Sequence, residues 1–314
     1  MRISFVGKGG SGKSTIAGLF TQCLRSRDEK VIAVDADINQ HFADLIDAEL
    51  DQDLALSRPE NVRKIKEHLT KNNSNVESVS HVYKTTPPGQ GSNLVTFSDE
   101  DFVLSEYGVK LDERTFFLHV GTYEKEGIGT SCYHTDLAIF ENILSHLSLE
   151  DEWLVADMVA GTDAFSNTLH AQFDAVFLVV EPTPEGLEVY NQYRKLSEEA
   201  GITDNLHLIG NKVMDEEDKV YLEDNINQEF IGFLQFKKKI KKSRQRGKIV
   251  RKDMMPYSLF EDMVSSAENS QITSKERLER IHKLHRKYAD QDYVKNAVGD
   301  ITDQIDRDFS YDQA

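Results

Sequence analysis

Cysteine, proline and tryptophan are scarce in this 314-residue chain, which contains two, six and one of them. The two cysteines, Cys23 and Cys132, cannot build a disulfide framework, so we expect a protein of a reducing compartment, the cytoplasm. Basic residues are also outnumbered, and the formal net charge is −17 at pH 7. A surface of this sign does not attract DNA or anionic lipid over its whole area.

Long hydrophobic runs are absent too. No apolar segment approaches the ~18 residues that a membrane-spanning helix needs. Residues 1–7 lead directly into a glycine-rich segment and leave no room for a signal sequence. Residues 300–314 are acidic, unlike the basic amphipathic helix that would hold a protein on an anionic membrane. We therefore expect a cytoplasmic protein that does not bind membranes.

What the chain does contain is an alternation of short apolar, β-branched runs with longer amphipathic patterns. This alternation predicts βαβ units wound into a mostly parallel sheet with helices on both faces. We expect strands at residues 3–7, 31–35, 116–120, 153–157, 175–180, 207–211 and 231–235. We expect helices at residues 13–27, 61–71, 137–147, 185–200 and 215–227.

Two segments do not fit this repeating unit. Residues 47–114 are polar and turn-rich, and we expect them to form an insertion at the sheet edge with one or two helices. From about residue 270 the chain has a charged, helical pattern, and it ends in a polar tail that we expect to fray. With no internal repeat and no obvious linker, residues 1–314 are predicted to form a single domain.

A phosphate loop follows the first predicted strand. Residues 7–14, Gly-Lys-Gly-Gly-Ser-Gly-Lys-Ser, match the pattern G-x-x-x-x-G-K-[ST] and precede a predicted helix. The glycines let successive backbone N–H groups face phosphate oxygen atoms, and the helix adds its positive end. Lys13 is predicted to reach the β- and γ-phosphates, and Ser14 to bind Mg²⁺. The residues expected to contact the nucleotide here are Gly9, Gly10, Ser11, Gly12, Lys13, Ser14 and Thr15.

Two further predicted strands end in carboxylates. Asp35 and Asp37 are two positions apart, so on an extended strand their side chains point to the same side. Asp157 ends another strand, and Gly161 follows it. Two carboxylates that face the same way beside a phosphate loop repel unless a cation or a bridging water lies between them. A turn or N-cap role for Asp35 and Asp37 stays open.

Lys8, just before a glycine pair, makes the loop resemble the deviant phosphate loop of the MinD/ParA/ArsA group of ATPases. The resemblance implies a three-layer P-loop NTPase fold and an ATP-bound homodimer in which Lys8 reaches the partner's nucleotide. An exposed loop cation is the alternative for Lys8. The resemblance also implies that Asp37 positions the attacking water, that Asp35 and Asp157 lie at the Mg²⁺, and that the Gly161 amide meets the γ-phosphate. Lys8, Lys13 and Asp37 are thus the expected catalytic residues.

The same resemblance implies a base-binding pair after the sixth predicted strand. In related folds an amide such as that of Asn211 binds the edge of the base, and a stem such as that of Lys212 stacks on its ring. Pro182 and Thr183 are expected to form the opposite wall. GTP-specific relatives carry Asp two positions after the lysine, where this chain has Met214. Adenine is therefore favoured, and guanine stays open.

The order of motifs resembles the carbon monoxide dehydrogenase accessory ATPase branch of this group. Residues 127–134 and the Asp-Met-Val-Ala-Gly at 157–161 carry this resemblance. That branch is implicated in nickel insertion and has Cys-x-Cys where this chain has Cys132-Tyr-His134. Two subunits could still supply two thiolates and two imidazoles to Zn²⁺ or Ni²⁺. A small buried Cys132 and a helix-capping or helix-lining His134 are the alternative.

Residues 237–252 form a basic run, with ten Lys or Arg and no acidic residue. Three interpretations are open: the run forms a solvated face, it binds an acidic partner, or it binds a DNA backbone. The expected function is a slow Mg²⁺-dependent ATPase that acts as a dimeric switch in metal delivery to, or maturation of, an unidentified client protein. The alternatives are a ParA-like positioning ATPase that uses the basic run and a nucleotide-sensing regulator with little turnover.

Overall fold

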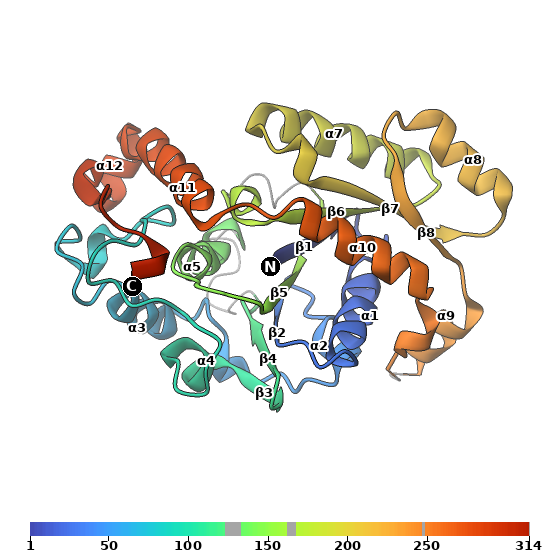
Figure 1. Cartoon of the computed structure of the whole chain (residues 1–314), viewed down its shortest axis with the longest axis horizontal. Coiled ribbons are helices and arrows are strands. Elements are labelled where there is room, and N and C mark those ends of the chain that lie inside the picture. The colour runs from blue at the N-terminus through green and yellow to red at the C-terminus, as the bar shows by residue number, and fades with distance from the viewer. Residues whose placement is uncertain (123–132, 162–167, 247–248, 314) are drawn as a thin grey trace.

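The structure is a computed structural model that describes residues 1–122, 133–161, 168–246 and 249–313 (Figure 1). These residues form an eight-stranded sheet in the order β3-β4-β2-β5-β1-β6-β7-β8. All neighbouring strands are parallel except β3 and β4. The strands are β1 (Arg2–Gly7), β2 (Val31–Ala36), β3 (Val109–Asp112), β4 (Thr115–His119), β5 (Trp153–Met158), β6 (Ala175–Val180), β7 (Leu206–Val213) and β8 (Phe230–Gln235).

The predicted mostly parallel α/β fold is confirmed, and all seven predicted strands are present. The eighth, β3, lies inside the predicted insertion and pairs antiparallel with β4 at the sheet edge. It was not predicted because it has four residues and includes the exposed, charged Lys110 and Asp112. Such a strand lacks the continuous apolar pattern of the buried ones.

Helices cover both faces of the sheet. The described helices are α1 (Lys13–Arg25), α2 (Ala43–Ile46), α3 (Pro59–Leu69), α4 (Phe102–Tyr107), α5 (Tyr133–Ser145), α7 (Pro184–Ala200), α8 (Glu216–Asn225), α9 (Lys238–Gln245), α10 (Tyr257–Asn269), α11 (Ser274–Ala289) and α12 (Asp292–Val298). The five predicted helices are among them, whereas α10 was missed although its apolar face is buried.

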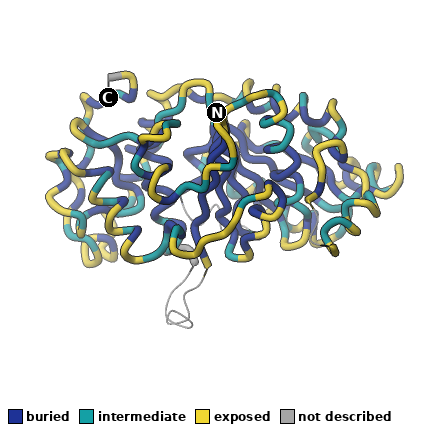
Figure 2. The backbone as a smooth tube through the Cα atoms, turned by 90° about the horizontal axis from the view of Figure 1, so that it is seen from below, coloured by how far each residue is buried: buried dark blue, intermediate teal, exposed yellow. Residues whose placement is uncertain are grey.

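Alternating strand residues divide the core into two layers. Ile3 and Phe5 of β1 belong to a cluster with α1, α2 and α10, whereas Val6 belongs to a cluster with α3, α4, α5, α7 and α8. This alternation is the period-two geometry of a strand buried on both faces. Figure 2 shows the buried strands running through the middle of the molecule, with exposed segments on the outside.

The insertion and the C-terminal segment pack against each other. His285 of α11 is buried and hydrogen-bonds the carbonyl oxygens of Thr85 and Ile301, at 2.9 and 2.8 Å. The predicted fraying of the tail is wrong. Phe309 and Tyr311 are each 7% exposed, because apolar side chains alternate with the polar residues of the tail and pack on α11.

The described helices include none that is both long and apolar enough to cross a membrane.

Candidate functional site

The phosphate loop connects β1 to α1 at the carboxyl edge of the sheet. Gly10 and Gly12 have φ angles of 84° and 96°, in the left-handed region that glycine adopts without strain. Gly12 is the N-cap of α1 and has no side chain to accept from the first N–H groups of the helix. A helix start of this kind offers its donors and its positive end to an anion.

Lys13, the first residue of α1, is buried among carboxylates. Its ammonium pairs with Asp37 and lies 3.5 Å from Oδ1 of Asp157. Burial lowers the pKa of Lys13, but Asp157 and Asp37 outweigh it, so the pKa lies above its ordinary value. Burial likewise raises the pKa of Asp37, but Lys13 outweighs it and the net shift is downward. Both groups are therefore charged at neutral pH.

Asp35 faces Asp157 across the neighbouring strands β2 and β5. Its two oxygens accept the backbone N–H groups of Asp37 (3.1 Å) and Phe42 (3.0 Å), which is the turn role left open by the sequence. Burial and the facing Asp157 raise the pKa of Asp35 well above its ordinary value. A role for Asp35 at a metal stays a prediction.

Asp157 and Ser14 fit a Mg²⁺ ion. Asp157 is fully buried, and its Oδ2 atom has no hydrogen-bond partner within the part of the chain that the structure describes. The Ser14 hydroxyl lies close enough to the same carboxyl group to lower its pKa. Hydroxyl and carboxylate oxygens are the ligands that Mg²⁺ takes beside nucleotide phosphates. Across the described residues, no group of three or more His, Cys, Asp or Glu side chains is placed to hold a metal, so nucleotide and water oxygens would complete the coordination.

Gly161 lies beside the start of the phosphate loop. Its N–H donates to the Gly7 carbonyl at 3.0 Å, and its own carbonyl accepts from the Tyr193 hydroxyl at 2.5 Å. To meet the γ-phosphate, as the sequence predicts, the Gly161 N–H would therefore have to leave the Gly7 carbonyl.

Asn211 and Lys212 brace the phosphate loop from β7. The Asn211 side-chain amide donates to the Ser11 carbonyl at 2.6 Å. The Lys212 ammonium donates to the Gly10 carbonyl and pairs with Glu181, next to Pro182. These contacts place both side chains at the phosphate loop, while the predicted contacts with a base stay predictions.

The other wall residue, Thr183, is the N-cap of α7, and its hydroxyl accepts from the Gly186 N–H at 3.1 Å. Lys8 lies near the same helix, with its ammonium 3.8 Å from the Glu185 carboxylate. The two side chains are 35% and 63% exposed. An exposed pair of this kind contributes little free energy, so Lys8 can leave Glu185 at low cost.

A cavity of about 360 Å³ lies against the loop residues Gly10, Gly12 and Thr15. Asn211, Lys212 and the end of β8 form part of its wall. The remaining wall belongs to the basic run: Lys237, Ile240, Lys241 and Arg244.

Sequence reasoning missed these wall residues, although a signal existed. The spacing 237, 240, 241, 244 follows one face of a helix. This helix comes directly after β8, at the strand edge where parallel sheets bind ligands. One face of the basic run is therefore part of the candidate nucleotide site, not of a purely solvated surface.

Cys132 lies outside the described residues. His134 belongs to the first turn of α5, but its side chain is not among the described ones. The proposed Cys-x-His metal site therefore stays a prediction from the sequence.

Replacing Lys241 tests whether α9 contributes to nucleotide binding. We expect Lys241→Glu to weaken binding of a fluorescent nucleoside triphosphate by about fivefold to tenfold at low salt, because it reverses a charge at the cavity wall. Lys242→Glu is the matched control, since it makes the same change on the same helix outside the cavity lining. Equal dissociation constants for the two variants would contradict the assignment.

The raised pKa of Asp157 predicts how the folding stability of the protein depends on pH. Burial raises its pKa to about 6, although Lys13 acts in the opposite direction. A carboxyl with a raised pKa binds its proton more tightly when folded, so its ionisation costs stability as the pH rises from about 4 to above 6. We expect Asp157→Asn to stabilise nucleotide-free protein by up to about 3 kcal/mol at pH 7.5 and by little at pH 4.

Urea denaturation at the two pH values measures this difference, with the exposed Asp44→Asn as control. A loss of stability at pH 7.5 in Asp157→Asn would show that its pairing with Lys13 outweighs the burial cost.

Comparisons with known proteins agree with this geometry. Residues 4–250 match the model of the CobQ/CobB/MinD/ParA nucleotide binding domain. An uncharacterized ATP-binding protein from Methanocaldococcus jannaschii is 30% identical over 259 residues, which are 81% of this chain and 92% of the relative. The carbon monoxide dehydrogenase accessory protein CooC from Rhodospirillum rubrum is 27% identical over 249 residues, 79% of this chain and 88% of the relative.

Among solved structures, a ParA family ATPase from Chlorobium tepidum TLS has the same fold, with a TM-score of 0.55 at 16% identity. The match covers 85% of this chain and 98% of that one. The family model spans the sheet from β1 to β8, together with the phosphate loop and the carboxylates around Lys13. The chain belongs to the CobQ/CobB/MinD/ParA nucleotide-binding family.

Proposed function

We propose that this protein is a Mg²⁺-dependent ATPase whose nucleotide state controls its dimerisation. The observation that carries the proposal is the gathering of Lys13, Asp37 and Asp157 around one phosphate loop. The M. jannaschii relative is named an ATP-binding protein, which supports ATP as the nucleotide.

The charges around Lys13 suggest how the site works. Phosphate oxygens of ATP compete with Asp37 and Asp157 for the Lys13 ammonium, because they carry more negative charge in the loop. Ser14 and Asp157 would hold Mg²⁺, which supplies positive charge at the β- and γ-phosphates. Release from Lys13 frees the Asp37 carboxylate to accept a hydrogen bond from the attacking water.

Asp37 acts in this proposal by orienting water rather than by removing its proton early. In the nucleotide-free protein Lys13 and Asn39 lower the pKa of Asp37, and the hydrogen bonds from Asn39 still lower it once Lys13 has turned to the phosphates. Asn39 also holds one Asp37 oxygen, through its backbone N–H at 3.0 Å and its side-chain amide at 2.9 Å. A carboxylate held in this way is suited to positioning, which is the role that phosphoryl transfer to water requires.

Lys8 is the proposed link to dimerisation. It lies half-exposed at the surface and pairs only loosely with Glu185 of its own subunit. Reaching the phosphates of a second subunit would exchange this weak pair for charge-assisted hydrogen bonds. ATP on both subunits would thereby stabilise the dimer, and hydrolysis would release it.

The similarity to an accessory protein of carbon monoxide dehydrogenase supports maturation of a partner metalloenzyme as the biological role. Cys132 and His134 would then bind Zn²⁺ or Ni²⁺ at the subunit interface, a part of the proposal that rests on the sequence alone. DNA positioning through the basic run is less favoured, because one face of α9 is directed to the nucleotide cavity.

Asp37→Asn tests the hydrolytic role. We expect ATP turnover, measured as phosphate release, to fall on the order of 10²-fold while ATP affinity changes by less than about threefold. Asp44→Asn, a surface change on nearby α2, should leave turnover unaltered. Turnover that is negligible in the wild type and equal in both variants would favour a nucleotide-sensing regulator instead.

Lys8→Ala tests the dimer. We expect this variant to bind ATP but to stay monomeric with a non-hydrolysable analogue in light-scattering chromatography, because it cannot reach the partner's phosphates. Glu185→Gln is the informative counterpart, since it frees Lys8 and should dimerise at an equal or lower concentration. Undiminished dimerisation of Lys8→Ala would refute the role given to this lysine.

A further inference from the structure

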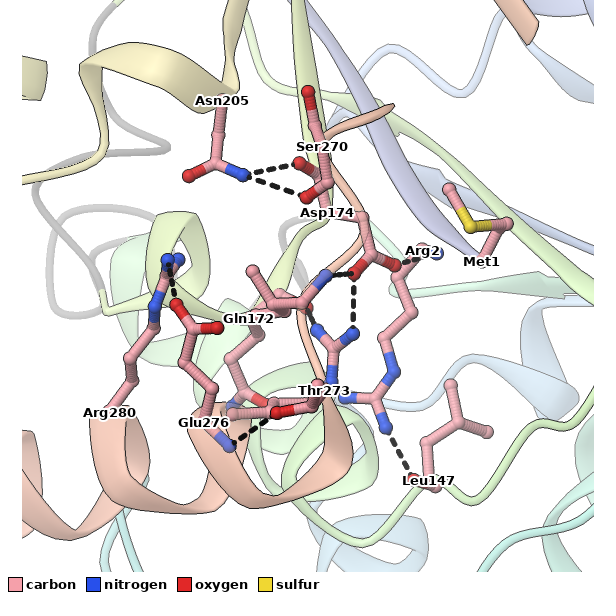
Figure 3. A network of polar contacts seen from close by, with 12 residues as sticks. Met1, Arg2, Leu147, Gln172, Asp174, Asn205, Ser270, Thr273, Glu276 and Arg280 are labelled. Atoms are coloured by element: carbon pink, nitrogen blue, oxygen red, sulfur yellow. Dashed lines mark hydrogen bonds and ion pairs between the residues drawn. The ribbon is translucent and has the colours of Figure 1, made fainter. Parts of the chain in front are cut away.

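A second cluster of buried charge lies at the opposite edge of the sheet, around the first residue of β1 (Figure 3). The guanidinium of Arg2 donates to the carbonyls of Leu144, at 2.8 Å, and Leu147. Arg277 of α11 donates to the Gln172 carbonyl and pairs with Asp174 at 2.7 Å. Two guanidinium groups thus meet between β1, the end of α5 and the start of α11.

Positive charge is in excess here. Arg2 and Arg277 are 5% and 6% exposed, and Asp174 pairs with the guanidinium of Arg277. Glu276 is turned to Arg280, at 2.9 Å, as Figure 3 shows. Burial and the neighbouring Arg277 lower the pKa of Arg2 to about 9, so the side chain is still charged at neutral pH. Buried charge without a matching partner is costly.

The carboxylate of Asp174 is also fully engaged. Asp174 accepts the backbone N–H of Arg2 at 2.6 Å and that of Ile272 at 3.0 Å, besides the guanidinium of Arg277. It therefore serves as a structural acceptor for three donors. Among the described residues, the Arg2 guanidinium is therefore left without a carboxylate of its own.

Hydrogen-bond donors are left over as well. A guanidinium carries five N–H donors. Within the described residues, the Arg2 guanidinium donates to two carbonyls, and the Arg277 guanidinium to one carbonyl and to Asp174. Each side chain therefore has donors available for a further acceptor.

These side chains line a small polar cavity of about 60 Å³. Asp174, Ser274 and Tyr311 also line it. A space of this size holds a few water molecules or one small polyatomic ion. The carbonyls at the end of α5 offset part of the charge of Arg2, but the start of α11 adds positive charge on the other side. The formal excess of positive charge remains.

We propose that this cavity binds one free inorganic oxyanion of the phosphate or sulfate class, held by Arg2 and Arg277. Planar guanidinium groups match the oxygen spacing of such anions through paired N–H···O bonds. The bound anion would join β1, α5 and α11, and so would stabilise the packing of the C-terminal helices on the sheet. The site is separate from the phosphate loop, which lies at the other end of β1.

Calorimetric titration of inorganic phosphate tests the proposal, using protein saturated with Mg²⁺ and a non-hydrolysable ATP analogue. We expect one saturable site in the wild type. Ser274→Asp should weaken it by about tenfold or more, because it adds a carboxylate at the cavity and keeps both arginines. Ser258→Asp is the matched control, an acid placed in the first turn of α10.

Phosphate should also raise the melting temperature of the wild type and of Ser258→Asp, but not that of Ser274→Asp. Because the two variants are compared directly, the result does not depend on whether the phosphate loop turns over ATP. No saturable phosphate binding, or equal binding by both variants, would overturn the site. Tighter binding of glycerol 3-phosphate than of phosphate would overturn its assignment to a free anion.

Discussion

Lys13 is buried at the carboxyl edge of a parallel sheet, and the sheet brings Asp37 and Asp157 to the same place. The ammonium keeps these carboxylates together although they repel one another, while Asp35 lies opposite Asp157 on the next strand. Asp37 and Asp157 by themselves already give the site more carboxylates than ammonium groups. That imbalance suits a divalent cation. A nucleotide that binds the Lys13 ammonium would also release Asp37 and Asp157 from their contacts with it.

The other polar groups of the site are directed to the phosphate loop itself. Asn211 and Lys212 hold the carbonyls of Ser11 and Gly10, and Gly161 holds that of Gly7. Contacts of this kind fix the conformation of the loop, which suits it to binding an anion through its backbone N–H groups. The same contacts connect β7 and the segment that follows β5 to the loop.

Strand β1 joins two regions of opposite charge balance. Its carboxyl end leads to Lys13 and an excess of carboxylates, whereas its first residue, Arg2, lies beside Arg277 with one carboxylate between them. Both regions are buried, where an unmatched charge costs most. Each therefore fits a ligand of the missing sign, a cation at one edge and an anion at the other.

The sequence alone determined the phosphate loop, the order of strands and helices, and the carboxylates at strand ends, because these depend on local spacing and hydropathy. By resemblance it assigned Asn211 to the base, whereas its contact with the Ser11 carbonyl came from the structure. Only the tertiary structure decided that Asp35 accepts two backbone N–H groups, that α9 walls the nucleotide cavity, and that Phe309 packs in a core. Arg2 and Arg277 are 275 positions apart along the chain. Local patterns carry no information on such pairs, because their meeting depends on how the whole chain packs.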